Sequence, residues 1–166
     1  MLYLGDFIKK LFKKNIIFTL VLIGVLSYQI IQANKIKEAL KNTSLSHYNL
    51  YSIEQNKTLS IKEIKSNSKI IYLWATWCPP CRLQNQILDF YHLIGIINKD
   101  EIIKISLDQD LKLLKNYLKE SSLKNHYLDH TNQFFSKEII RGTPTILKID
   151  EEGKIINFKM GISFIF

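Results

Sequence analysis

The two cysteines of this chain, Cys78 and Cys81, are the residues whose type and spacing could carry out chemistry. They are the only cysteines among 166 residues, so neither can join a wider disulfide framework within the chain. Two thiols three positions apart can open and close one disulfide. Because the thiolate is the attacking species, we expect Cys78 to be an exposed nucleophile. Cys81, almost one helical turn later, would attack the mixed disulfide and release the substrate.

A strand and a helix must position this pair. The run Ile70–Trp74, rich in Ile and aromatic residues, predicts a buried strand before the cysteines. A helix is predicted from Pro79 to about Ile97, because apolar residues recur there at 83, 87, 90, 91 and 94. Cys78 would then lie at the helix N-terminus, where unpaired N–H groups and the helix dipole stabilise an anion.

Two prolines separate the cysteines. Pro79 and Pro80 fit the first helical turn, where a missing N–H costs no intrahelical hydrogen bond. Neither can donate an N–H to the Cys78 sulfur, so we expect a weaker stabilisation of its thiolate than in strongly oxidising CxxC proteins.

A metal site and a buried, inert pair are the alternatives for the two cysteines. A structural zinc site needs four ligands, and the remaining candidates are only scattered histidines. The aromatic residues and prolines around the pair suit a reactive site better than a core. We therefore expect no metal, and no cofactor other than the redox-active disulfide itself. The four histidines are His47, His92, His126 and His130.

Two segments resemble a known family. Leu73–Arg82, with the sequence LWATWCPPCR, resembles the active-site segment of membrane-anchored thioredoxin-like proteins of the TlpA/ResA/DsbE (CcmG) family. Arg141–Thr145, with the sequence RGTPT, resembles the cis-proline loop that faces the cysteines in that superfamily. The resemblance implies that Trp77 shields the pair, and that Thr143 and Pro144 dock the substrate backbone. The residues alone leave open a trans proline that begins an edge strand.

The resemblance also implies a function. It predicts an exported, membrane-tethered thiol–disulfide oxidoreductase that reduces protein disulfides, for example those of apocytochrome c during cytochrome c maturation. A membrane thiol transporter of the DsbD/CcdA type would supply the electrons. A disulfide-donating oxidase stays open, as does a redox-inactive module that binds unfolded or assembling proteins. A copper carrier that uses the two thiols is a remote further option.

The N-terminal sequence predicts the compartment. Residues 1–14 form a basic cytoplasmic segment, and 15–34 form a mostly apolar run of 20 residues, roughly the 30 Å of one hydrocarbon core. Lysines on the N-terminal side place that side in the cytoplasm. We expect a single-pass anchor in the bacterial inner membrane, a polar tether over 35–46 and a redox domain over 47–166 in the periplasm or extracytoplasmic space. A cleaved signal peptide is the competing interpretation.

Composition argues against nucleic-acid binding. The chain has 23 basic and 15 acidic residues, a formal charge of +8. The excess is spread over lysines, and Arg82 and Arg141 are the only arginines. Nucleic-acid binding typically shows clustered basic patches with interleaved aromatic residues, which this chain lacks.

The predicted fold is α/β and thioredoxin-like, with a mixed central sheet flanked by helices. The helix and strand between 108 and 130 correspond to the TlpA-type insertion, and the last two strands form a hairpin. The expected strands are Tyr48–Ile53, Leu59–Ile64 (or a helical turn), Ile70–Trp74, Glu101–Leu107, a brief one near Tyr127, 145–149 and 154–160; beyond the CxxC helix, the expected helices are Asp110–Lys119 and about 132–139.

Three features depart from the family pattern. Tyr72 stands where thioredoxins carry a buried Asp. In the CRxExP pattern of the family, the residues at the Glu and Pro positions are here Gln84 and Gln86. Neither position therefore supplies a carboxylate to tune the thiols. Family members usually carry an amphipathic helix after the final hairpin, and we expect none here because Gly161–Phe166 is too short to form one; a truncated gene is the competing interpretation. We expect part of the sheet to be uncovered, or covered by a partner, the membrane surface or the apolar tail.

Overall fold

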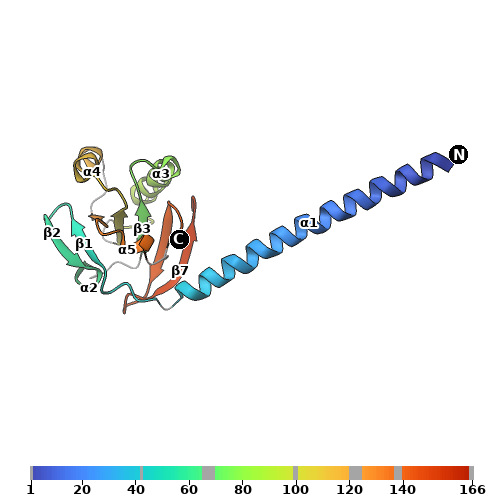
Figure 1. Ribbon diagram of the computed structural model, residues 1–166. Helices are drawn as coiled ribbons and strands as arrows, with labels where there is room; N and C mark the ends of the chain where they lie inside the picture. The colour runs from blue at the N-terminus through green and yellow to red at the C-terminus, as the bar shows by residue number, and fades with distance from the viewer. Residues whose placement is uncertain are drawn as a thin grey trace. The chain divides into compact units, whose positions relative to one another are not determined.

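The structure, a computed structural model, describes residues 2–41, 43–64, 70–98, 101–119, 125–136 and 140–164. The chain divides into two compact units, Met1–Ala39 and Leu40–Phe166. The first unit is formed by the helix α1 (Leu2–Leu40) up to Ala39, and this helix contains the expected anchor segment (Figure 1). Its side chains from Ile16 to Ile31 are exposed. In the described part of the chain, none of the helices is long and apolar enough to cross a membrane.

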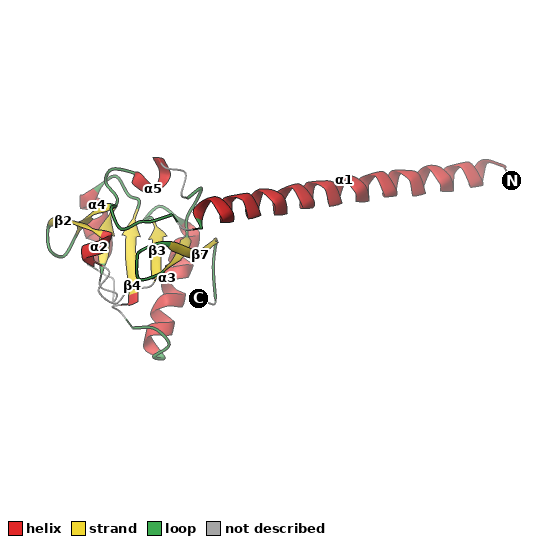
Figure 2. Cartoon of the chain, turned by 90° about the horizontal axis from the view of Figure 1, so that it is seen from below, coloured by secondary structure: helices red, strands yellow, loops and turns green. Residues whose placement is uncertain are grey.

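The second unit is built on one seven-stranded sheet with the strand order β2-β1-β5-β4-β3-β6-β7. Its strand β3 runs parallel to β4, and β4 runs parallel to β5, whereas the other neighbours are antiparallel. Figure 2 shows β3 and β4 as adjacent arrows that point the same way. The elements are β1 (Asn49–Ser52), β2 (Lys57–Ser60), α2 (Ile61–Ile64), β3 (Ile70–Trp74), α3 (Pro79–Leu93), β4 (Ile102–Ser106), α4 (Leu111–Leu118), β5 (His126–Leu128), α5 (Gln133–Ser136), β6 (Thr145–Ile149) and β7 (Ile155–Met160).

The central strands β4 and β5 are buried along their whole length because helices cover the sheet. All five residues of β4 are buried, and β5 is buried throughout. The crossovers β3–α3–β4 and β4–α4–β5 proceed in the same direction across the sheet, which places both helices on one face (Figure 1). The mixed sheet and flanking helices of the prediction are therefore confirmed.

Most predicted elements occur close to their predicted positions. The CxxC helix is shorter than expected: it ends at Leu93, because Gly95 adopts a positive φ of 74° and its N–H bonds to the carbonyl of His92. The helix expected at 132–139 is present as α5, and residues 137–139 lie outside the described residues.

The segment expected to be a tether, 35–46, is helical up to Leu40 and then packs on the redox domain. Leu40 and Leu45 are both buried. The N–H of Leu45 donates to the carbonyl of Gly153 at 2.9 Å, next to an isolated bridge between Ser44 and Lys154. These contacts tie the beginning of the domain to the β6–β7 turn.

The chain after β7 contains no helix as far as Phe164, the last described residue. The register places Lys159 beside Ile146, and Asn157 beside Lys148. Because Ile146 packs in the cluster that includes the α3 cysteines, this strip of β6 and β7 lies on the α3 face. Lys148, Asn157 and Lys159 are exposed there, so the strip is polar rather than apolar.

Candidate functional site

The CxxC pair lies at the start of α3. Cys78 is the N-cap residue, with Pro79 and Pro80 in the first turn, as predicted. Cys78 and Cys81 form a disulfide, with a Cα–Cα distance of 5.3 Å. The Cys81 N–H donates to the Cys78 sulfur at 3.2 Å. Because the two prolines have no N–H, this is the first donor that the helix can offer to Cys78.

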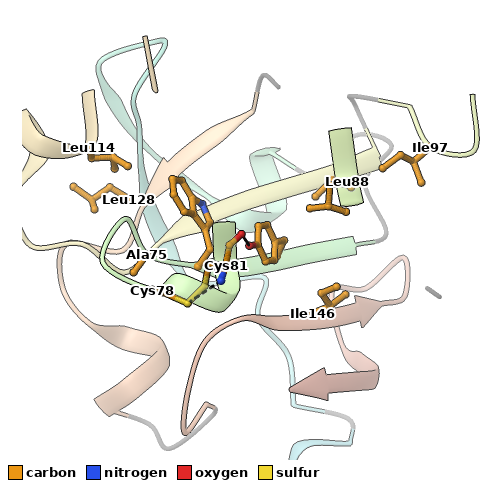
Figure 3. Packing of buried hydrophobic residues seen from close by; sticks show 11 residues of the cluster. Ala75, Cys78, Cys81, Leu88, Ile97, Leu114, Leu128 and Ile146 are labelled. Atoms are coloured by element: carbon orange, nitrogen blue, oxygen red, sulfur yellow. Dashed lines mark hydrogen bonds between the residues drawn. A yellow bond between two sulfur atoms is a disulfide. The ribbon is translucent and has the colours of Figure 1, made fainter. Parts of the chain in front are cut away.

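The expectation that Cys78 is exposed is wrong for this oxidised state. Cys78 is 3 % exposed and Cys81 is 1 % exposed. Both pack into an apolar cluster with Trp74 and Ala75 (Figure 3), which explains their burial. Trp77, predicted to shield the pair, is itself 63 % exposed. The buried aromatic rings of the cluster are those of Tyr72 and Trp74, and the sequence had predicted Trp74 only as part of a strand.

Tyr72 occupies the position at which thioredoxins carry a buried carboxylate. It is fully buried, and its hydroxyl donates to the carbonyl of Cys81 at 3.3 Å. Burial, with a smaller contribution from Tyr117, raises the pKa of Tyr72 above its usual value. The side chain therefore stays a neutral phenol and serves as a hydrogen-bond donor to the CxxC turn.

A buried carboxylate that sequence reasoning missed holds the loop before the cysteines. Asp108 is 2 % exposed and accepts hydrogen bonds from the Thr76 N–H at 3.0 Å and from the Thr76 hydroxyl at 2.7 Å. The Ser106 hydroxyl donates to the same carboxylate. These donors compensate for the burial of the charge. The only sequence signal was a Ser-x-Asp at the end of a buried strand.

The loop before β6 contains the predicted cis bond. The Thr143–Pro144 peptide is cis, so the alternative of a trans proline is wrong. Pro144 is buried and Thr143 is half-buried. The carbonyl of Pro144 accepts the Gly161 N–H at 2.8 Å, which occupies it with the chain after β7. Ile146, two residues later, joins the cluster of the disulfide, so the structure brings the cis-proline strand and the CxxC helix together.

The two glutamines of α3 differ in their surroundings. Gln84 is completely buried and hydrogen-bonded to the backbone of Ser163, whereas Gln86 is exposed. Among the described residues, no group of three or more His, Cys, Asp or Glu side chains is arranged to hold a metal ion.

Comparison with known proteins points to thiol–disulfide chemistry. Residues 32–163 match the family model described as Redoxin. The chain is 26% identical over 155 residues to thiol-disulfide oxidoreductase ResA of Bacillus thuringiensis subsp. konkukian, with 87% of both proteins covered. Its match to a ResA of Bacillus cereus is 26% identical over 112 residues and spans 64% of this chain and 62% of that relative.

A solved structure shows the same fold. The crystal structure of StoA from Bacillus subtilis is similar with a TM-score of 0.55 at 21% identity, covering 70% of this chain and 88% of StoA. The domain thus has a thioredoxin-like α/β fold and a CxxC pair at disulfide distance, and it is a thiol–disulfide oxidoreductase. With the family model matched over most of its length, the chain belongs to the Redoxin family.

Proposed function

We propose that this chain reduces disulfides of other proteins outside the cytoplasm. The observation that carries the proposal is the Cys78–Cys81 disulfide at the N-terminus of α3. In the reduced chain, the Cys78 thiolate attacks one sulfur of a substrate disulfide, and the other sulfur leaves as a thiolate that takes a proton from water. Cys81 then loses its proton, attacks the Cys78 sulfur and releases the substrate as a dithiol. Two electrons and two protons pass to the substrate, and the pair becomes the disulfide.

The direction of electron flow is argued from the N-terminus of the helix. A strong oxidant needs a reduced form that is well stabilised, which for a CxxC pair means a stable thiolate. Here the two prolines of the first turn have no N–H to donate. The Cys81 N–H is the first that the helix offers to the Cys78 sulfur. A weaker stabilisation of the thiolate favours a reductant.

Substrate and electron donor follow from the family resemblance. We propose that Thr143 and Pro144 dock an extended segment of the substrate, such as the haem-binding site of apocytochrome c. A membrane thiol transporter of the DsbD/CcdA type would re-reduce the pair. Trp77 is a large side chain beside Cys78 and is 63 % exposed, so it is placed to contact such partners.

Attachment to the membrane through the N-terminal segment is part of the proposal. The apolar side chains from Ile16 to Ile31 are exposed to their surroundings, and lysines precede them. The full chain is expected in the membrane fraction of cells after a wash with alkaline carbonate. A variant that begins at Leu40 serves as the control and should be found outside that fraction. Release of the full chain by carbonate would contradict the anchor.

The reduction potential of the pair tests the proposed direction. Equilibration in glutathione buffers is expected to give a value near or below about −270 mV, the range of thioredoxin. A value approaching about −120 mV would instead identify a disulfide-donating oxidase. Replacing both cysteines with serine should abolish the cellular role, and a role that survives this change would identify a redox-inactive binding module.

A further inference from the structure

Gln84 is a buried polar side chain one turn after Cys81. It is 0 % exposed, and a buried amide needs hydrogen-bond partners for both its oxygen and its nitrogen. Residues three apart on a helix lie on the same face, so Gln84 and Cys81 face the same side of α3.

The partners of Gln84 come from the end of the chain. Its Nε2 donates to the carbonyl of Ser163 at 3.0 Å, and the Ser163 N–H donates to its Oε1 at 2.7 Å. The two bonds form a reciprocal pair, as between neighbouring strands of a sheet, with a side chain in place of one strand. Both bonds are buried, which removes the competition of water.

Two further bonds fasten the same segment. The Gly161 N–H donates to the carbonyl of Pro144 at 2.8 Å, and the Tyr91 hydroxyl donates to the carbonyl of Phe164. Residues 161–164, here named the C-terminal segment, therefore connect the cis-proline loop with the CxxC helix. The segment lies on the same side of α3 as Cys81, in the part of the molecule where the sequence predicts no covering helix.

The two reciprocal hydrogen bonds require a carboxamide side chain at position 84. Glutamine supplies one donor and one acceptor, as the Ser163 backbone requires. An ionised carboxylate only accepts, so it would leave the carbonyl of Ser163 facing a negative oxygen without a proton between them. Only the protonated form of a carboxylic acid reproduces the pattern of the amide.

We propose that Gln84 is a positioning residue of the redox site: it holds the C-terminal segment against α3, and the segment in turn closes the environment of Cys81. Cys81 is 1 % exposed with the segment in place, so its reaction is restricted to the neighbouring Cys78 sulfur. The inference rests on thiol chemistry at this pair, as does the proposed function, but it is independent of the direction of electron flow.

Amide hydrogen exchange in the full-length chain tests the first half of the proposal. In Q84A, the Ser163 N–H is expected to lose protection on the order of tenfold or more, because two buried hydrogen bonds are removed. The variant Q86E carries a carboxylate on the exposed Gln86 of the same helix and should leave that protection unchanged. Retained protection of Ser163 in Q84A would overturn the proposal.

The variant Q84E tests the hydrogen-bond pattern of the pair through its pH dependence. Burial and the bond to the Ser163 carbonyl favour the neutral acid and raise the pKa of the introduced carboxyl. Protection of Ser163 should therefore approach the wild-type value at about pH 5 and disappear towards pH 8. A profile parallel to that of Q86E would contradict the role of the amide.

Thiol reactivity tests the second half. In a C78S background, Cys81 is the only thiol, and its alkylation is expected to be on the order of tenfold faster with Q84A than without it. A chain that ends at Gly161 should show the same acceleration, and Q84A should add little to it, since both changes remove one interaction. An unchanged alkylation rate in either variant would overturn the link to Cys81. Neither readout uses a disulfide substrate, so a failure of the proposed reductase activity would be seen separately in a substrate assay.

Discussion

At the level of single residues, position on the helix rather than burial separates the two cysteines, because Cys78 is 3 % and Cys81 is 1 % exposed in the disulfide. Cys78 caps the helix beside the exposed Trp77, whereas Cys81 lies inside the turn with its carbonyl bonded to Tyr72. We therefore expect a substrate to reach the pair from the side of Cys78 once the pair is reduced. Cys81 is then expected to act on the sulfur that is already bonded to Cys78.

This division predicts different products from the two single variants. C81S is expected to accumulate disulfide-linked complexes with its substrates, because serine cannot resolve the mixed disulfide. C78S should form almost none, since Cys81 lies inside the first turn of α3 with its carbonyl bonded to Tyr72. Non-reducing gels of cell extracts measure both, with reductant-treated samples as the control. Equal amounts of complex from the two variants would show that Cys81 is also open to substrate.

Lys104 is a charged residue in the middle of the buried strand β4, and the site does not use it. It is 3 % exposed, and its neighbours in the register are Tyr72 on one side and His126 on the other. Burial lowers the pKa of Lys104 to about 8, and the nearby Asp89 charge opposes that change. In the unfolded chain, the lysine titrates near its ordinary value of about 10.4.

The pH dependence of stability follows from that difference. Between about pH 8 and 10.4 the unfolded chain binds the additional proton, so the free energy of unfolding should rise with pH in this range. Below about pH 8 both states are protonated and the cost of burial is constant. K104M should raise the free energy of unfolding at pH 7 by about 3 kcal/mol and remove the rise between pH 8 and 9.5.

Urea unfolding of the oxidised chain at several pH values measures this effect. K148M, at an exposed lysine of the same sheet, is the matched control and should leave both stability and slope unchanged. A K104M variant that unfolds at lower urea than the wild type at pH 7 would show that the amine is a stabilising group.

At the level of elements, the junction between β3 and α3 depends on a residue of the next strand. Asp108 lies just beyond β4 and fixes Thr76, two residues before Cys78, from 32 positions away in the sequence. The β3–β4 ladder carries the carboxylate to that place, and the Leu107 N–H extends the pairing by donating to the Trp74 carbonyl at 2.9 Å. The loop before the helix is therefore held by the sheet itself.

Replacing this carboxylate should loosen the start of α3. D108N is expected to lower the free energy of unfolding by about 1–3 kcal/mol, because an amide group would face donors that the second carboxylate oxygen now satisfies. D110N is the matched control: Asp110 caps α4 by accepting the N–H groups of Lys112 and Leu113, and asparagine caps a helix about equally well. Denaturant titration of both variants measures the difference. Equal stability of the two variants would mean that the Asp108 network contributes little.

The same elements show what the sequence could predict. The strand of residues 70–74, the CxxC helix and the β6–β7 hairpin follow from local periodicity, so they were found at nearly the right positions. The Asp108 network and the Gln84–Ser163 pair join residues 32 and 79 positions apart. No local pattern encodes such partners, because only the assembled sheet and helix bring them together.

For the whole molecule, the polar strip on β6 and β7 bears on the expectation that part of the sheet is uncovered. Lys148, Asn157 and Lys159 occupy the exposed positions on the α3 side, while the C-terminal segment lies against α3 itself. A missing cover was expected because Gly161–Phe166 is too short to form the helix that usually follows the hairpin. The register of the hairpin decides which side chains face α3. Only this register shows that the exposed positions of the strip carry polar side chains, which water can solvate.

The redox state of the Cys78–Cys81 pair is expected to affect the stability of the whole domain. A neutral disulfide suits the apolar cluster in which Cys78 and Cys81 are nearly fully buried, whereas a thiolate there would be desolvated. Folding and reduction form a thermodynamic cycle. A fold that lowers the reduction potential of the pair stabilises the disulfide form by about 1.4 kcal/mol for every 30 mV relative to the unfolded chain.

We expect the oxidised chain to unfold at higher urea concentration than the reduced chain. Parallel titrations with and without a thiol reductant measure the difference, and the double variant C78S/C81S should give the same midpoint under both conditions. A reduced chain that is the more stable one would mean that the fold favours the dithiol. In that case the pair would donate its disulfide to other proteins, and the proposed direction of electron flow would be reversed.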